Sequence, residues 1–277
     1  MTLFYYVPWW LVTAVVTLIC VAVACGGHIL VRRAFPRTNF IEHNEVAGFI
    51  VAVVGVLYAV LLGFLTVVVW EHFSAAEDQT VQEVDAATDI ARFADQIDAI
   101  DRLRVVSDLK SYTGAVIHDE WPKMQNGESS AKAQLYVTRL FADASEMRVK
   151  SLRDANLQNH LLDRVQTMAD LRRRRITSDQ SAMPPVVWAS LIAGGAALMG
   201  FIYLFGLKNF KAQLLMTAAT ATMIGLCFSI VISLDYPYRG DISISPERWI
   251  ALDRELTAGG LDAGSKRVPR EKMRGFQ

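Results

Sequence analysis

The sequence predicts an all-α protein with four transmembrane helices and a helical soluble insert between the second and third spans. Of its 277 residues, 52% are hydrophobic, a share that is unusual for a soluble domain of this length. The apolar residues come in four blocks free of Asp, Glu, Lys and Arg, each long enough to cross a bilayer core as a helix of roughly 20 residues. The segment between the second and third blocks is charged but keeps a helical apolar period.

The four spans are expected at residues 9–31, 46–70, 186–205 and 213–234. Short connections join the first span to the second and the third to the fourth, so each pair forms a hairpin. The chain is therefore expected to divide into a hairpin at 1–70, a helical insert at 71–183, a second hairpin at 184–234 and a C-terminal segment at 235–277. The end of that segment, 259–277, mixes Gly, Pro and basic residues and is expected to be disordered.

The second span is expected to leave the membrane without a break. No glycine lies between Gly63 and Gly114, and no proline lies between Pro36 and Pro122. Since these are the residues that most often end a helix, the pattern predicts one helix from about Ala47 to beyond residue 89. After the span this helix is acidic, with Glu71, Glu77, Asp78, Glu83, Asp85 and Asp89.

Small residues form a stripe along two of the spans. In the second span they recur at spacings of three or four, and a comparable stripe lies in the fourth span. Such stripes let helices approach closely, or they line a pore, and the sequence leaves both interpretations open. The residues are Gly48, Ala52, Gly55, Ala59 and Gly63 in the second span, and Ala218, Thr222, Gly225, Ser229 and Ser233 in the fourth.

Further amphipathic helices are expected in the insert at about 101–118, 131–153 and 155–175, with no strand. The last of these ends in a run of four arginines, Arg172, Arg173, Arg174 and Arg175. A basic run close to a membrane is typical of a contact with lipid headgroups or with another anion.

Candidate pore or vestibule residues lie on the second span and its acidic continuation. Acids at a pore mouth set the local potential and the ion preference, whereas the alternative is a helix that simply enters water. The candidates are Leu57, Leu61, Leu65, Val68, Glu71, His72 and Glu77. No motif for a catalytic residue, a cofactor or a metal is present, so the protein is not expected to be an enzyme.

Charge does not decide the orientation in the membrane. The two hairpin loops carry Arg32, Arg33, Arg37, Lys208 and Lys211, and the side of the insert carries the arginine run, Arg239 and Arg248. The rule that positive residues stay inside the cell therefore gives nearly equal counts. Lys+Arg 28 against Asp+Glu 28 also gives no indication of nucleic-acid binding.

Several motifs resemble a bacterial family of four-span membrane proteins of unknown function with a bestrophin-like domain. They are WEHFSAAE at 70–77, DEWP at 119–122, the arginine run leading to PPVVW at 184–188, GFIYLFG at 200–206, LDYPYRG at 234–240 and ISP at 244–246. Bestrophins are pentameric anion channels with two spans, a helical cytosolic region and two more spans. The resemblance implies that layout here, with the second span lining the pore and the insert and termini in the cytoplasm.

The expected function is that of a multi-pass protein of the bacterial inner membrane, acting as an oligomeric bestrophin-like ion channel. The resemblance implies a homo-oligomer, a pentamer if the likeness extends that far, in contact with membrane lipids and inorganic ions and without a cofactor. The acids after Trp70 favour cation preference or weak selectivity. The alternative is a non-conducting signalling or scaffold protein that acts through its helical insert, and an intramembrane enzyme is a distant third.

Overall fold

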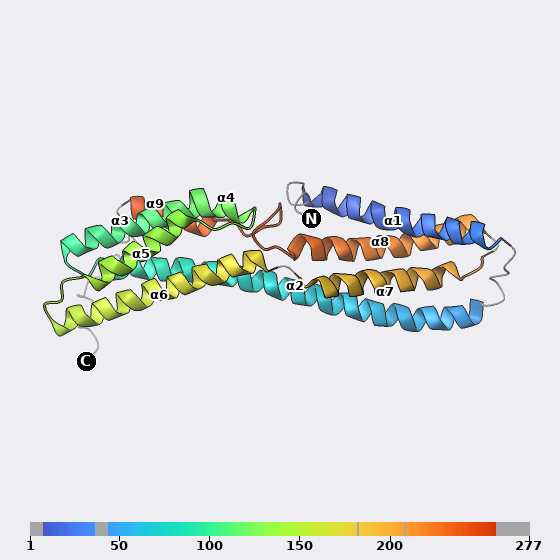
Figure 1. Ribbon diagram of the computed structural model, residues 1–277, viewed down its shortest axis with the longest axis horizontal. Helices are drawn as coiled ribbons and strands as arrows, with labels where there is room; N and C mark the ends of the chain where they lie inside the picture. The colour runs from blue at the N-terminus through green and yellow to red at the C-terminus, as the bar shows by residue number, and fades with distance from the viewer. Residues whose placement is uncertain (1–7, 37–43, 182, 208, 259–277) are drawn as a thin grey trace, which may run out of the picture. The chain divides into compact units, whose positions relative to one another are not determined.

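A computed structural model describes residues 8–36, 44–181, 183–207 and 209–258, and within these ranges it contains helices but no strand (Figure 1). The predicted all-α fold with four long apolar helices is thereby confirmed. The helices are α1 (Trp9–Ala34), α2 (Asn44–Ala94), α3 (Ala99–Ala115), the π-helical turn η3 (Val116–Glu120), α4 (Trp121–Met124), α5 (Ala131–Ser145), α6 (Leu152–Gln180), α7 (Pro185–Tyr203), α8 (Phe210–Leu234) and α9 (Glu247–Thr257).

The chain divides into two compact units. Unit 1 consists of Met1–Ala75 and Gln180–Ser243, and unit 2 consists of Ala76–Asp179 and Ile244–Gln277. Helix α2 contributes its first part to unit 1 and its second part to unit 2. The predicted disorder of 259–277 concerns residues outside those described.

Unit 1 contains the four helices that are long and apolar enough to cross a membrane, namely α1, the first part of α2, α7 and α8. The two helices of the second hairpin, α7 and α8, each begin at residues that favour the start of a helix. Pro184 precedes α7 and Pro185 is its first residue, and the Asn209 side chain accepts hydrogen bonds from the N–H groups of Lys211 and Ala212 at the start of α8.

The prediction of an unbroken α2 is confirmed, since this helix runs over 51 residues from Asn44 to Ala94. At 1.5 Å per residue its length is roughly 76 Å, which exceeds the roughly 30 Å of a bilayer core. The helix therefore has ample length to continue beyond a membrane.

Unit 2 is built from the second part of α2 together with α3, α5, α6 and α9. Asp98 caps α3 and Ser130 caps α5, each through its side chain. The helix expected at 131–153 was too long, because α5 ends at Ser145 and α6 begins only at Leu152. The Asp101 carboxylate accepts a hydrogen bond from the N–H of Arg148 at 3.2 Å. This bond stabilises the non-helical segment between α5 and α6.

Helix α9 was not predicted. Its Trp249 is completely buried and meets Tyr112 of α3 edge-on, with ring centroids 5.6 Å apart. The chain after the fourth span therefore returns to complete the core of unit 2.

Candidate functional site

One face of α2 in unit 1 packs against neighbouring helices and the opposite face does not. Tyr58, Leu62 and Val69 are buried, and the Tyr58 hydroxyl donates a hydrogen bond to the Leu191 carbonyl of α7 at 3.1 Å. On the other side, Val56 is 63% exposed and Phe64 is 68% exposed. Such large apolar side chains require a lipid or protein environment. The exposed side also includes Phe49, Val53, Val60 and Val67.

The predicted pore residues do not all lie on that exposed side. Leu57, Leu61, Val68 and Glu71 are exposed in the isolated chain, but Leu65 and His72 are half-buried. Leu65 packs against the buried clusters around Leu62 and Val69. Glu77 is exposed and belongs to unit 2. Val60 and Phe64, which the sequence reasoning missed, face outward more squarely than Leu65.

The small residues of α2 divide in the same way. A Cβ atom at Gly48 would lie 3.7 Å from Phe205, and one at Gly55 would lie 3.8 Å from Leu198, so these two positions face α7 and the segment after it. Ala52, Ala59 and Gly63 are exposed. Close packing therefore explains only part of the stripe.

Where α8 ends, Asp235 lies beside His72 of α2 in a small cavity that Met183 and Pro184 also line. The Asp235 carboxylate accepts a hydrogen bond from the Met183 N–H at 2.9 Å. Burial raises the pKa of Asp235, and the Met183 hydrogen bond and the charge of His72 oppose that shift only in part. This contact fixes the start of α7 to the end of α8.

A second polar arrangement lies at the other end of unit 1. The Arg32 guanidinium of α1 donates hydrogen bonds to the Phe205 carbonyl and, at 2.7 Å, to the Gln213 side chain. The Asn44 side chain of α2 donates to the Gly206 carbonyl at 2.8 Å and accepts from the Gly206 N–H at 2.9 Å. Together these bonds hold the connection between α7 and α8 against α1 and α2.

Two members of the arginine run are buried inside unit 2. Arg175 forms a bidentate ion pair with Glu83 of α2, at 2.6 Å and 3.0 Å, and contacts Glu120 of η3 at 2.7 Å. Arg172 contacts the same Glu120 at 2.5 Å and donates to the Gln134 side chain at 2.6 Å. We call Glu83, Glu120, Arg172 and Arg175 the ionic cluster.

The ionic cluster contains two positive and two negative side chains, so its charges balance. Burial alone would raise the pKa of Glu120, but the charge of Arg175 and the hydrogen bonds from Arg172 outweigh it and hold the pKa below its ordinary value. The Tyr112 hydroxyl donates to Glu83 at 2.6 Å. Burial and the negative charge of Glu83 raise the pKa of Tyr112 well above its ordinary value, so it remains a donor.

The other two arginines have a different environment. Arg173 and Arg174 are exposed on α6, and Arg173 forms an ion pair with Asp170 three residues earlier. The lipid or anion contact expected for the run is therefore kept as a proposal for Arg173 and Arg174. The sequence contained a signal for the difference, because the buried stripe of α6 continues at helical spacing into the two cluster arginines. Its members are Leu157, Leu161, Val165, Met168, Arg172 and Arg175.

Comparison with known proteins supports the same architecture. The family model described as the bestrophin-like domain matches residues 18–249 of the chain. The chain belongs to the bestrophin-like family. No match was found among curated protein sequences.

Solved structures with the same fold come from a bacterial bestrophin homologue of Klebsiella pneumoniae. Two single-residue variants of that homologue have TM-scores of 0.64 and 0.66, sequence identities of 13% and 12%, and cover 87% of this bestrophin-like chain and 98% of their own. A third structure of the homologue has a TM-score of 0.63 at 12% identity, covering 87% of this chain and 97% of its own. At these identities the likeness establishes the fold.

The described part of this bestrophin-like chain places no three His, Cys, Asp or Glu residues close enough together to hold a metal ion. The two polar arrangements of unit 1 and the ionic cluster are thus made of side chains that bind one another or the backbone. All four spans expose large apolar side chains in the isolated chain, and the exposed face of α2 is the one that carries the predicted pore residues.

Proposed function

We propose that the protein is an oligomeric ion channel in which α2 lines the pore. The observation that carries this proposal is the exposed face of α2 in a chain of the bestrophin-like family. A homo-oligomer about an axis parallel to α2 covers that face with copies of itself, and a pentamer is the expected assembly from the resemblance. Closed cyclic symmetry is also the usual arrangement when identical chains enclose a common axis.

Val56, Val60 and Phe64 form the candidate constriction. Their spacing of four places them in one row along the helix, and they lie opposite Tyr58 and Leu62, which face α7. A ring of such side chains from each subunit makes a narrow apolar segment that controls conduction by excluding water. Leu57, Leu61 and Val68 flank this row and are assigned to the pore wall or to the adjacent subunit.

Glu71 follows the constriction on the same helix, about 11 Å further along it at 1.5 Å per residue, and it is exposed. One such carboxylate from each subunit gives the mouth a negative potential, which attracts cations and repels anions. Glu77 adds to that potential beyond the mouth, and His72, half-buried beside Asp235, supports the helix there. We therefore expect cation preference or weak selectivity.

Recordings from purified protein in lipid bilayers test this function. Glu71→Gln should shift the reversal potential toward that of the anion, and more strongly at low salt, because screening acts within about 10 Å at 0.1 M. Phe64→Ala should raise conductance by widening the constriction. The matched controls are Glu247→Gln, an exposed acid of α9, and Leu18→Ala, an exposed apolar residue of α1. Both should behave as the wild type.

Two results would count against the proposal in different ways. An absence of conductance in correctly assembled wild-type protein would favour the alternative, a signalling or scaffold protein that acts through unit 2. An unchanged reversal potential in Glu71→Gln would remove Glu71 from the ion path. Native mass spectrometry of the same preparation would give the number of subunits.

We further propose that the protein lies in the bacterial inner membrane with unit 2 and both termini in the cytoplasm. Single cysteines at Ser129 and Asn39, in a background without the native cysteines, test this with a membrane-impermeant thiol reagent on intact cells. Labelling is expected at position 39 and not at position 129. The opposite pattern would reverse the orientation.

A further inference from the structure

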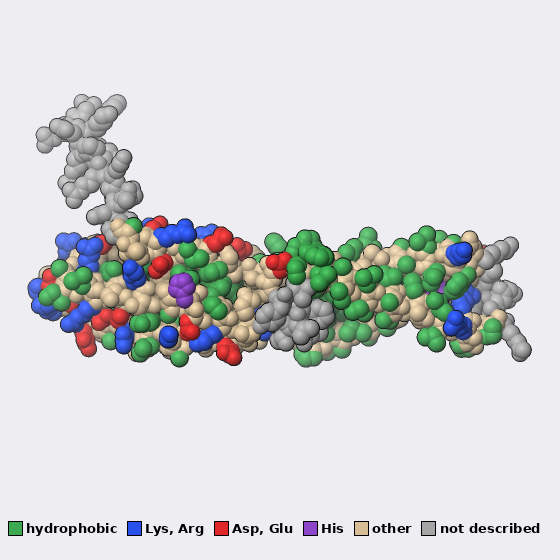
Figure 2. Space-filling view, turned by 90° about the horizontal axis from the view of Figure 1, so that it is seen from above, with side chains coloured by type: hydrophobic (Ala, Val, Ile, Leu, Met, Phe, Trp, Pro, Cys, Tyr) green, Lys and Arg blue, Asp and Glu red, His purple; other side chains and the backbone are tan. Residues whose placement is uncertain are grey.

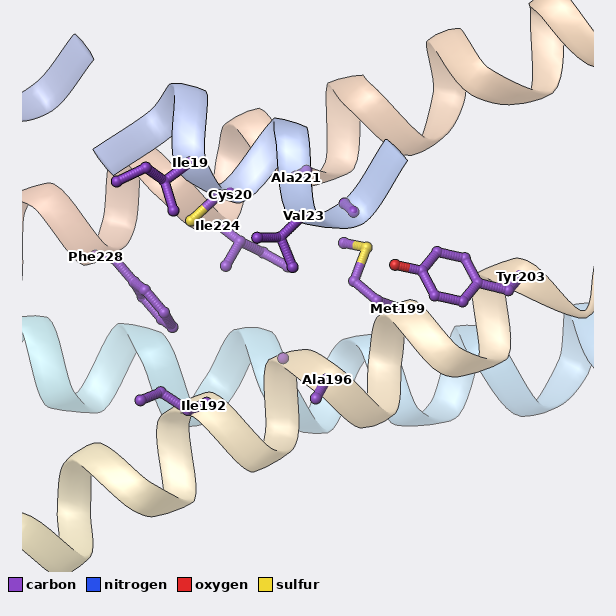
Figure 3. A pocket seen from close by; sticks show the side chains of 12 residues that line it. Ile19, Cys20, Val23, Ile192, Ala196, Met199, Tyr203, Ala221, Ile224 and Phe228 are labelled. Atoms are coloured by element: carbon purple, nitrogen blue, oxygen red, sulfur yellow. The ribbon is translucent and has the colours of Figure 1, made fainter. Parts of the chain in front are cut away.

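An elongated cavity of about 320 Å³ lies among α1, α7 and α8 of unit 1 (Figure 3). Its walls are apolar except for the Cys20 thiol and the Tyr203 hydroxyl, which Figure 3 shows directed toward Met199. The volume falls at the lower end of the range of about 300–1,000 Å³ that is typical of small-molecule sites. The surrounding helices therefore leave room for a narrow apolar group.

The cavity interrupts packing that is otherwise very close. A Cβ atom at Gly225 of α8 would lie 2.8 Å from the Thr17 backbone of α1, and one at Gly27 of α1 would lie 2.7 Å from the Tyr203 hydroxyl of α7. Between these two approaches the lining residues include four small ones, Ala24, Gly195, Ala196 and Ala221. Gly195 also lies against α2, where a Cβ atom would meet the Tyr58 hydroxyl at 2.9 Å. Larger residues at the three alanine positions would take up space in the cavity.

The shape and the opening of the cavity suit a chain. Its α7 lining runs from Ile192 to Tyr203, which corresponds to about 16 Å along the helix axis. Val23, Ile192 and Ile19 at the rim are 68%, 60% and 53% exposed. These residues lie inside the membrane-spanning helices, so the opening faces the hydrocarbon of the bilayer.

The end of unit 1 at which α7 ends with Tyr203 carries positive charge. α1 ends and α8 begins at that end (Figure 1), and basic side chains gather there on the surface (Figure 2). Arg33, in the last turn of α1, and Lys211, in the first turn of α8, are both exposed. They lie nine and ten residues along their helices from the lining residues Ala24 and Ala221, about 14–15 Å away, which is half of a roughly 30 Å hydrocarbon core.

We propose that this cavity binds one acyl chain of an anionic phospholipid. The chain enters through the lateral opening at Val23, Ile192 and Ile19 and lies along α7, and the phosphate group lies at the level of Arg33 and Lys211. The apolar wall excludes polar ligands, the lateral opening gives access from the bilayer, and the two cations match the headgroup charge. This site does not depend on whether the protein conducts ions.

Photo-crosslinking of the full-length protein in vesicles tests the proposal. The probe is a phosphatidylglycerol with a diazirine near the end of one acyl chain, and the cross-linked peptides are mapped by mass spectrometry. Two substitutions fill the cavity, Ala196→Phe on α7 and Val23→Trp on α1. Their matched controls are Ala197→Phe, an exposed alanine next in sequence, and Leu18→Trp, 67% exposed where Val23 is 68% exposed.

Cross-links are expected on the lining residues, and both filling variants should reduce their yield about tenfold or more, a free-energy difference of roughly 1.4 kcal/mol. Both controls should keep the wild-type yield. Replacing Arg33 and Lys211 with Gln should remove the preference for phosphatidylglycerol over a matched phosphatidylcholine probe while cross-linking at the lining persists. Size-exclusion profiles and thermal melts establish that each variant is folded.

Other patterns would overturn the proposal. Cross-links spread evenly over the exposed faces of the four spans, and unaffected by the filling variants, would show that the cavity holds no chain. Cross-links at the lining only after the oligomer is dispersed into single chains would show that a second copy of the protein fills the cavity. Equal labelling by both probes in the wild type would refute the headgroup assignment.

Discussion

Unit 1 and unit 2 are both helical and both have apolar cores, yet they expose opposite kinds of side chain. Unit 1 presents large apolar residues outward, whereas the surface of unit 2 is charged (Figure 2). Inside, unit 1 brings its helices together at glycines, and unit 2 places two arginines and two glutamates in its core. In lipid, apolar surface gains nothing by leaving its surroundings, so close packing must hold the helices together. In water, burial of Leu, Val and Trp supplies stability that offsets the desolvation of the ionic cluster.

The largest effect is expected from breaking the ionic cluster. Arg175→Ala leaves Glu83 without its bidentate partner in a fully buried position, and removal of one member of a buried ion pair typically costs about 3–5 kcal/mol. Chemical unfolding of the purified full-length protein, followed by helical circular dichroism, should show a lower midpoint. The control Arg174→Ala changes an exposed arginine of the same run and should leave the midpoint unchanged. Equal midpoints for the two variants would refute the role given to the cluster.

The next largest effect is expected in the helix that both units share. Ala76→Pro removes a backbone donor in the interior of α2 and should cost about 3 kcal/mol or more. Limited proteolysis should then cut near residue 76, and the wild type, whose helix is unbroken there, should resist cleavage. The control Ala76→Ser changes the same residue but keeps its backbone N–H, so this variant should remain resistant to the protease. A proline variant that resists cleavage as the wild type does would show that α2 tolerates an interruption there.

Glycine-to-alanine substitutions are expected to change the stability of unit 1 and of unit 2 in opposite directions. Gly225→Ala in unit 1 places a Cβ atom 2.8 Å from the Thr17 backbone, and overpacking of this kind costs about 1–3 kcal/mol. Gly114→Ala in α3 of unit 2 meets nothing within 4 Å and should stabilise by about 0.5–1 kcal/mol, because alanine favours the helix. Thermal melts of both variants in one detergent would show this difference in sign. If the melting temperature shifted in the same direction in both variants, the proposal that unit 1 depends on close helix packing at its glycines would be refuted.

The smallest effect is expected from acid. Because the pKa of Glu120 is lowered in the folded protein, its contribution to stability is complete above its ordinary pKa of about 4.3 and is lost as the pH falls through the lowered value. Each unit of difference is worth about 1.4 kcal/mol. Midpoint temperatures of the wild type should fall below about pH 4, and those of Glu120→Gln should fall less steeply. Parallel curves for the two proteins would show that another group controls acid unfolding.

Sequence reasoning succeeded where the cause is local. The spans and the unbroken α2 follow from the composition of each segment and from the absence of Gly and Pro between Gly63 and Gly114. It failed where partners are distant, since Arg175 lies 92 residues from Glu83 and 55 from Glu120. The outward face of α2 was also only partly predicted. The rotation of a helix about its axis depends on which neighbour it packs against, and here Leu65 packs inward.

Helix α9 shows the same limit. Trp249 and Leu252 are its buried residues, and a helix of eleven residues offers too few apolar positions for a clear period. The role of its apolar residues is evident only from their packing against α3, which lies far earlier in the chain. The sequence analysis placed these residues in a C-terminal segment at 235–277, and the described residues from Ile244 to Ala258 group with unit 2 in the structure.

Because α9 packs in unit 2, this unit can complete its core only after nearly the whole chain has been synthesised. Tyr112 and Trp249 are adjacent in the folded core, but the ribosome makes α7 and α8 between them. At about 5–20 residues per second, roughly 7–27 s separate the emergence of these two residues. Throughout that interval the Tyr112 side of α3 lacks its cover. Unit 2 therefore lacks part of its core until the ribosome has produced the last membrane hairpin and then α9.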